Sequence, residues 1–254
     1  MPEFDPTIEA QAESIVDRNQ ELLNQSELSW ALNEAYTRAI NLRPELADVE
    51  IVEMPKDSPS NASARPSWAS ETGQNQVFLR VDDLDHTLGT FEKAMKEIPG
   101  LTEEFASQYN LQPEQVTPQL LYVTSFMHEL GHTLEYKEHA DDPEAHKTAI
   151  KREREAMPLG NVVVSKLIKE GTPHHEWLHD NWDGLQAKTG AADIDEAIRM
   201  QHAAYRGVSN EHAADMFAID VIATSPTLID SLTDPNALQE MRDWHEVNVA
   251  APAA

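Results

Sequence analysis

A regular apolar stripe constrains the fold of this 254-residue chain more than any other sequence feature. Its members recur at spacings of 4, 3, 4, 3 and 4 and are Val116, Leu120, Val123, Met127, Leu130 and Leu134. This period is typical of an amphipathic helix of about five turns. Thr117-Pro118 supplies an N-cap residue and a proline at the first helical position. We therefore expect one long helix that begins near Thr117 and packs its stripe on a core.

The same helix carries the pattern HExxH in His128-Glu129-Leu130-Gly131-His132. Two histidines four residues apart share one helix face, here about 140° from the apolar stripe at 100° per residue. Both imidazoles could reach one Zn²⁺ at about 2.0–2.1 Å, and Glu129 could take a proton from a water on that metal. We predict one Zn²⁺ per chain, with His128 and His132 as ligands and Glu129 as the general base.

A second copy of the pattern, His175-Glu176-Trp177-Leu178-His179, competes with the first. Gly171-Thr172-Pro173 directly precedes it and the polar pair Asp180-Asn181 follows it, so it opens a short segment without a long apolar stripe. A metal ligand has to be held by packing, which only the first copy provides. We interpret the second copy as a short surface helix, and a separate second zinc site there stays open.

The best third ligand lies in the segment Ser209–Ile219, where Glu211 and Asp215 are four residues apart. The residues after Glu211 are almost all apolar, so Asp215 is expected to be buried and to need a partner. Zinc-bound histidines commonly donate their second N–H to a carboxylate. We predict Glu211 as a ligand and Asp215 as the partner of His128. The alternative is a dipole-favoured Glu at a helix N-terminus and an Asp in a structural ion pair, with Glu135 or Asp183 as third ligand.

These two segments resemble the gluzincin metallopeptidases, which carry HExxH on one helix and a glutamate on a later one. The segment NEHAAD matches NExxSD of thermolysin-like enzymes at Asn, Glu and Asp, with Ala214 in place of Ser. The Glu-x-x-Ala-Asp form also looks like bacterial regulatory and self-processing zinc peptidases. The resemblance implies the roles just given to His128, Glu129, His132, Glu211 and Asp215.

The resemblance also implies a fold, a substrate and a place for that substrate. In gluzincins an edge strand upstream of the HExxH helix holds the substrate backbone, and residues 76–81 occupy the matching place. Glu211 lies 79 residues after His132, a longer gap than in thermolysin-like enzymes, and 32 after His179, which is closer to the usual spacing. The implied activity is hydrolysis of a peptide or protein substrate.

Hydrolysis needs a further donor for the tetrahedral oxyanion. His202, Tyr205 and Arg206 are candidates, and His174 and His175 are also available. Two alternative functions stay open. One is a non-enzymatic zincin-like interaction or regulatory module that acts through an acidic surface, and the other is a zinc hydrolase of a non-peptide amide.

The charge of the chain excludes other classes of partner. The sequence has 19 Lys and Arg against 45 Asp and Glu, a net charge of −26, which argues against nucleic acid and against anionic membranes. It has no cysteine, hence no disulfide and no thiolate zinc site. The N-terminus lacks the charged and apolar regions of a signal peptide, and no stretch approaches 18 apolar residues. We expect a soluble cytoplasmic protein.

Local patterns predict an α+β fold that is mostly helical and zincin-like, with a small N-terminal sheet before the active-site helix and a helical C-terminal part. Strands are expected at 49–54 and 76–81, and other helices at 8–22, 28–42, 84–98, 102–109, 141–157, 192–206, 209–223 and 234–247. Residues 55–75 read as a long loop, 226–232 as a connector, and 161–168 as either helix or strand. We expect a tail and helix over 1–25, one metallopeptidase domain over 26–248 and a tail over 249–254.

Overall fold

The computed structural model describes residues 6–250, which form a mostly helical α+β structure, 69% helical, with one small sheet. The first five residues of the tail and helix expected over 1–25, and residues 251–254 of the expected C-terminal tail, lie outside this range. The strands are β1 (Glu50–Glu53), β2 (Ala62–Arg65) and β3 (Gln76–Leu79). The main helices are α1 (Pro6–Leu23), α2 (Ser29–Leu42), α3 (Leu84–Glu97), α4 (Leu101–Tyr109), α5 (Pro118–Glu138), α6 (Pro143–Glu155), α7 (Val164–Ile168), α8 (Pro173–Asp180), α9 (Trp182–Thr189), α10 (Ile194–Arg206), α11 (Ser209–Ala223), α12 (Pro226–Thr233) and α13 (Ala237–His245).

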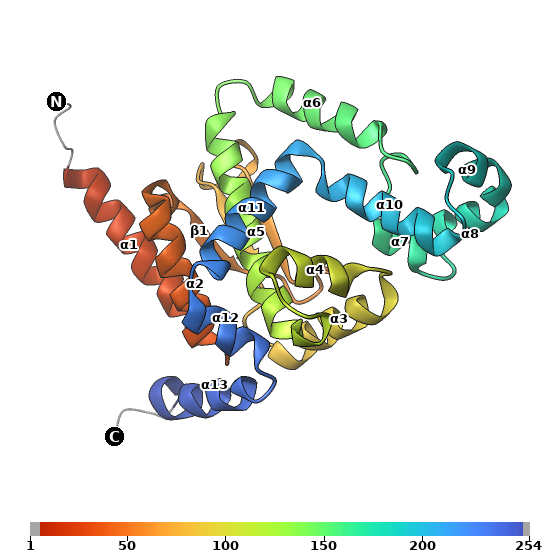
Figure 1. Ribbon diagram of the computed structural model, residues 1–254. Coiled ribbons are helices and arrows are strands. Elements are labelled where there is room, and N and C mark those ends of the chain that lie inside the picture. Colours follow the sequence, from red (N-terminus) through yellow and green to blue (C-terminus); the bar gives the residue numbers. More distant parts are fainter. Residues whose placement is uncertain (1–5, 251–254) are drawn as a thin grey trace.

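Helix α5 is the helix that carries HExxH, and it runs through the middle of the molecule (Figure 1). It begins as expected, because the Thr117 side chain accepts a hydrogen bond from the Leu120 N–H and Pro118 occupies the first turn. Most of the predicted stripe is buried, and only Leu134 is partly exposed. The side opposite the stripe is buried too, since Leu121, Tyr122, Phe126 and Thr133 are also covered. The helix is therefore a central one, covered on nearly all sides.

The sheet has the order β1-β3-β2, with β1 parallel and β2 antiparallel to β3. It lies along α5, and the Tyr122 hydroxyl donates to the Arg80 carbonyl at 2.5 Å. Strand β3 falls within the predicted strand 76–81, but it is the central strand and not the edge strand that the resemblance implied. The edge strand beside α5 is β2, which lies within the segment predicted as a loop.

The segment 55–75 is thus not one long loop. Besides β2 it contains a short 3₁₀ turn, Ser67–Ala69, and its first part wraps around the buried side chain of Arg80. The Arg80 Nη2 donates to the carbonyls of Pro55, Ser58 and Ser60 at 2.9–3.4 Å. A guanidinium presents five donors in a fixed fork, so a single side chain can order several turns of backbone.

Two other elements differ from the sequence-based expectation, and a third settles an assignment that the sequence left open. Residues 226–232 are helical as α12, because Ser225 caps the helix through the Leu228 N–H and Pro226 follows it. The ambiguous segment 161–168 forms the short helix α7. The last helix begins at Ala237 instead of Asp234, because the Asp234 carboxylate accepts the Asn236 N–H and forms a turn, and a π-helical turn follows at Glu246–Ala250.

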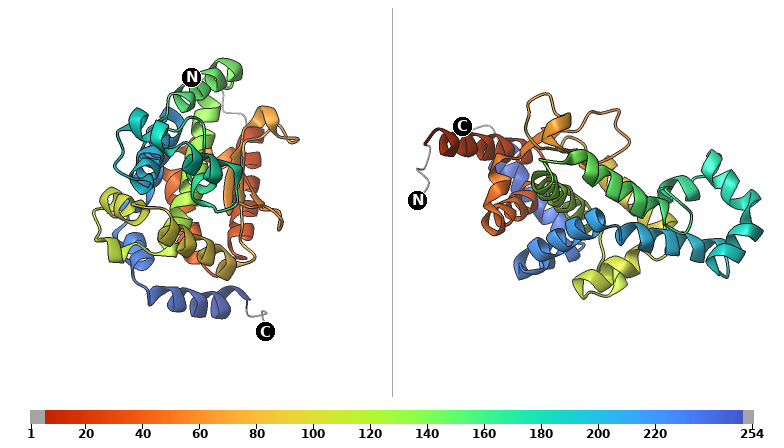
Figure 2. Two further views of the ribbon diagram at one scale, coloured as in Figure 1. Left: turned by 90° about the vertical axis from the view of Figure 1, so that its right-hand side faces the viewer. Right: turned by 90° about the horizontal axis from the view of Figure 1, so that it is seen from above.

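The buried apolar residues form two clusters. The larger one surrounds α5, and the smaller one joins α7, α8, α9 and α10 through residues such as Leu167 and Leu178. Figures 1 and 2 show α8 and α9 at the far end of the molecule from α1. Helix α1, which the domain prediction placed outside the main domain, packs on the large cluster: the Asn19 amide bonds to the Val49 carbonyl and the Ile51 N–H, both at 2.8 Å.

Helices α5 and α11 come very close together at Gly131, inside the HExxH motif. A Cβ built on Gly131 would lie 2.8 Å from the Ala214 Cα and 3.2 Å from its Cβ. Real Cβ atoms do not come this close to backbone, so the two small residues allow the helix axes to approach as they do. The close approach brings the first two turns of α11, with Glu211 and Asp215, against the face of α5 that carries the two histidines.

The replacement Gly131→Ala should therefore push α11 away from α5. We expect the free energy of unfolding in urea to fall by about 1–3 kcal/mol, the usual cost of overpacking. Gly89→Ala is the matched control, because Gly89 lies in a helix with no atom within 4 Å of its added Cβ. Alanine there should be neutral or stabilise by up to about 1 kcal/mol. Equal stability of Gly131→Ala and the parent would show that the close approach is not required.

Candidate metal centre

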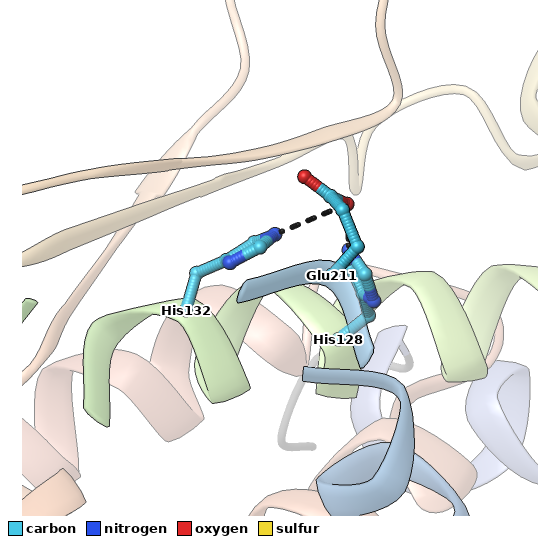
Figure 3. Close-up of side chains that lie close together, drawn as sticks. All are labelled: His128, His132 and Glu211. Carbon is cyan, nitrogen blue, oxygen red and sulfur yellow. Dashed lines mark ion pairs between the residues drawn. The ribbon is translucent and has the colours of Figure 1, made fainter. Parts of the chain in front are cut away.

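Three side chains from two helices converge beside the Gly131–Ala214 contact. His128 and His132 come from α5 and Glu211 from the first turn of α11, and all three are at least nine-tenths buried (Figure 3). Glu211 Oε2 lies 3.3 Å from His128 Nε2 and 3.6 Å from His132 Nε2. One ligand atom from each residue lies within 4.8 Å of the others, so the three predicted ligands are brought together.

The spacing of these atoms fits a zinc ion. Two ligand atoms about 2.1 Å from a tetrahedral Zn²⁺ are about 3.4 Å apart, close to the two separations from Glu211 Oε2. Two imidazole nitrogens and one carboxylate oxygen are also the donor set of many catalytic zinc sites, which keep a fourth position open. The chain contains no cysteine that could replace them.

The second carboxylate oxygen of Glu211 is held by one donor from a third helix and one from α11 itself. Arg154 Nη2, from α6, donates to Glu211 Oε1 at 2.7 Å, and the Asn210 amide donates to the same oxygen at 3.2 Å. Oε2 is thereby left to face the histidines. Sequence reasoning missed Arg154, because it lies in a run of alternating charges, and residues 141–157 read only as a solvated helix. Helix α6 indeed has no buried residue, yet it reaches the centre through this side chain.

Asp215 is buried and bonds to the other nitrogen of the first histidine, as predicted. The His128 Nδ1–H donates to Asp215 Oδ1 at 2.7 Å, which directs Nε2 toward Glu211. The same Oδ1 lies 2.6 Å from Nη2 of Arg206 on α10. The Asp215 carboxylate therefore links the His128 imidazole to the Arg206 guanidinium, and Arg206 already has a carboxylate partner.

His132 has a different environment. Its ring stacks on the ring of Tyr136, with centroids 6.1 Å apart. The Trp68 ring in turn meets the Tyr136 ring edge-on, with centroids 5.7 Å apart. Its Nδ1 lies 3.6 Å from Glu135 Oε2, which is too long for a hydrogen bond. Glu135 and Tyr136 follow His132 by three and four residues, so helical spacing alone could have indicated both contacts.

Glu135, the alternative third ligand, does not face the nitrogens that converge on Glu211. It faces Nδ1 of His132 and not Nε2, and its other oxygen lies 3.1 Å from His146 Nε2. Glu135, His139 and His146 form a second cluster of potential donors. The two rings in it are stacked at 4.3 Å with an angle of 11°. Nitrogen lone pairs lie in the ring plane, so one metal cannot lie in the planes of both stacked rings.

The electrostatics of the centre favour positive charge on the two histidine rings. Burial works against charge on His128, but hydrogen bonds to Asp215 and Glu211 outweigh it and raise its pKa. Burial also opposes charge on His132, yet the carboxylates of Glu135 and Glu211 raise its pKa to about 10. Burial likewise disfavours the Glu211 carboxylate, but the two histidines lower its pKa. Metal binding at these nitrogens has to displace protons.

Glu129 and the three predicted oxyanion donors differ in their partners around the centre. Glu129 is half-buried, and its negative charge helps to raise the pKa of both histidines. His202 Nδ1 is 2.8 Å from Glu104 Oε2, so this ring, like Arg206, already has a carboxylate partner. Burial raises the pKa of Tyr205, and the nearby charge of Glu211 adds to this, so its hydroxyl keeps its proton.

The second HExxH copy lies on α8, in the part of the molecule that holds the small cluster. The rings of His175 and His179 are 4.5 Å apart, as their spacing requires. Among residues 14–249, no third histidine or carboxylate joins them in a group able to hold a metal. Asp183, the other alternative ligand, likewise joins no such group within this part of the chain.

Comparison with protein-family models, with curated proteins and with solved structures finds no match to this chain. Within the described residues, no helix has both the length and the apolar character that crossing a membrane requires. Functional inference therefore depends on the chemistry of the centre itself.

Replacing Glu211 and Asp215 one at a time should distinguish a metal ligand from a residue that holds a ligand in place. We expect Glu211→Ala to lower zinc affinity more than Asp215→Ala, for which the loss should be about 10–100-fold. Asp215→Ala should also lower the melting temperature with EDTA present, because Arg206 loses its buried partner. Competition with a chromophoric chelator measures the affinities. Asp220→Ala, which removes an exposed carboxylate on the same helix, is the control. Unchanged zinc affinity in Glu211→Ala would exclude Glu211 as a ligand.

Zinc binding should depend on the first HExxH copy and not on the second. We expect His128→Ala or His132→Ala to abolish stoichiometric zinc, while His175→Ala and His179→Ala, singly or together, retain one equivalent. Only the first pair has a convergent carboxylate. Elemental analysis after zinc supplementation and dialysis measures the content. The reverse pattern would transfer the site to α8, and loss of zinc from both sets would indicate two sites.

Proposed function

We propose that this protein is a zinc-dependent peptidase of the gluzincin type. The observation that carries the proposal is the convergence of His128 Nε2, His132 Nε2 and Glu211 Oε2 from two tightly packed helices. The segments HELGH and NEHAAD, which first indicated the resemblance, supply all three atoms as well as the Asp215 support for His128. Bound Zn²⁺ would polarise a scissile carbonyl and lower the pKa of water to about 7.

The residues of the chain have distinct parts in the proposed reaction. Glu129 takes a proton from the attacking water and later delivers it to the leaving amine. Asp215, Arg154 and Asn210 hold the ligands in place through the hydrogen bonds described above. Of the three predicted oxyanion donors, Tyr205 is the best placed, since His202 and Arg206 are already paired with carboxylates.

The substrate backbone is proposed to pair with β2. In gluzincins an edge strand upstream of the HExxH helix has this task, and β2 is the edge strand that packs alongside α5. An edge strand leaves a row of backbone N–H and C=O groups free for an added strand. Trp68 follows β2 directly and lies against Tyr136, so the substrate would lie near the His132 side of the centre.

The replacement Glu129→Gln tests the mechanism. The amide keeps the shape of the side chain but cannot accept the proton, so we expect unchanged zinc content and a 10²–10⁴-fold lower kcat, the usual size of general-base effects. Cleavage of a peptide library, followed by mass spectrometry, measures the rates, and EDTA should abolish them. Equal rates for variant and parent would remove Glu129 from the mechanism. A parent that binds zinc but cleaves no peptide would favour the interaction module or another amide substrate.

A further inference from the structure

A pocket of about 310 Å³ adjoins the candidate metal centre. On one side it is lined by the face of α6 that carries Lys147, Lys151 and Arg154. On the other side lie the aromatic rings of Trp68 and Tyr136. Helix α6, at the top of Figure 1, has no buried residue, so one wall of the pocket belongs to an exposed helix.

The lining of this pocket has the opposite charge to the protein. It includes three cationic side chains and no Asp or Glu, whereas the whole chain has 45 acidic residues and 19 basic ones. The three cations are spaced four and three residues apart, so they share one face of α6. A larger cavity of about 1090 Å³ lies on the neighbouring face of α6, but residues of both charges line it, including Arg43, Glu45 and Asp142.

Three residues of the pocket touch the predicted metal ligands. Arg154 and Asn210 both donate to Glu211 Oε1, and Tyr136 stacks on His132. A group bound in the pocket would therefore lie next to the bond that the centre would hydrolyse. This position distinguishes the pocket from a basic patch elsewhere on the surface.

The cations of the pocket retain capacity for an anion. Arg154 Nε is buried and has no hydrogen-bond partner among the described residues. Among the described residues, Lys147 pairs only with Glu144 and Lys151 only with Glu155, both on their own helix. The two lysine side chains are more than half exposed, at 53% and 71%. Exposed pairs of this kind are weak and exchange readily with another partner.

We propose that this pocket binds a carboxylate of the substrate, so that the enzyme prefers peptides with an acidic group near the scissile bond. The carboxylate has two possible sources, an Asp or Glu side chain and the C-terminus of the peptide. The proposal rests on the proposed peptidase function, whose site it extends. Two lysines and an arginine attract the carboxylate, and the aromatic rings exclude water beside it.

The first test compares cleavage of matched peptides. A library peptide cleaved by the parent is remade with Glu or Gln on either side of the scissile bond, and with a free or an amidated C-terminus. We expect kcat/KM to be about tenfold higher for one of the acidic forms than for its neutral counterpart, because several weak ion pairs add up. In about 0.5 M salt most of this difference should disappear. Preference confined to Glu identifies a side chain, and preference confined to the free C-terminus identifies a terminal carboxylate.

The double variant Lys147→Gln/Lys151→Gln tests the pocket without touching the ligand Glu211. The acidic-to-neutral ratio of kcat/KM should fall from about tenfold to about twofold or less. Lys166→Gln/Lys169→Gln makes the same charge change at two exposed positions outside the pocket and should keep the parent ratio. A parent ratio near one for both carboxylate sources, or an unchanged ratio in the pocket variant, would overturn the proposal.

A binding measurement separates this inference from the peptidase proposal. Zinc-loaded Glu129→Gln protein is titrated into library peptides made in the same acidic and neutral forms, chosen whether or not the parent cleaves them and carrying a neutral dye. Fluorescence anisotropy gives Kd. About tenfold tighter binding of an acidic form, lost in the triple variant with Lys147→Gln/Lys151→Gln, supports the pocket even if the parent cleaves nothing. Equal Kd for acidic and neutral peptides refutes the pocket, and cleavage by the parent would then leave the peptidase proposal intact.

Discussion

The candidate centre depends above all on the close contact of Gly131 with Ala214. The histidines belong to one helix and the carboxylates to another, so their separation is set by how near the two helices come. At this crossing a single added Cβ would meet backbone at 2.8 Å. Protein interiors are packed too densely to absorb such an overlap without movement. Gly131 of HELGH and Ala214 of NEHAAD therefore set the spacing of the site, although neither side chain is a predicted metal ligand.

The second constraint is the need to balance buried charge. Glu211 lies between the two histidines and Arg154, and Asp215 lies between His128 and Arg206. Burial of a carboxylate without partners is strongly unfavourable, and each of these has a guanidinium from a third helix to reduce that cost. The arginines come from α6 and α10, so the helices that surround α5 and α11 also complete the electrostatics of the centre.

The charged residues of α6 contact the candidate centre and also line the pocket beside it. The helix has no buried residue, and polar contacts such as Arg154 with Glu211 and Glu153 with Ser209 connect it to α11. The chain has a net charge of −26, yet this helix lines a pocket whose Lys and Arg residues have no Asp or Glu beside them in the lining. Substrate selection and ligand support would then depend on the same exposed helix.

The sequence by itself determined the parts of this protein that follow from local periodicity. The apolar stripe and Thr117-Pro118 predicted the start of α5, and helical spacing predicted that His128 and His132 share one face. The apolar residues around Asp215 predicted that it is buried and needs a partner. Tertiary structure alone decided which strand lies at the sheet edge, since residues 62–65 have no strong alternating pattern and form β2 only through pairing with β3. It also decided the role of Arg154, because nothing local separates this arginine from Arg152 until α6 lies beside α11. Contacts between residues distant in sequence have no periodicity, so they emerge only when the helices and strands pack.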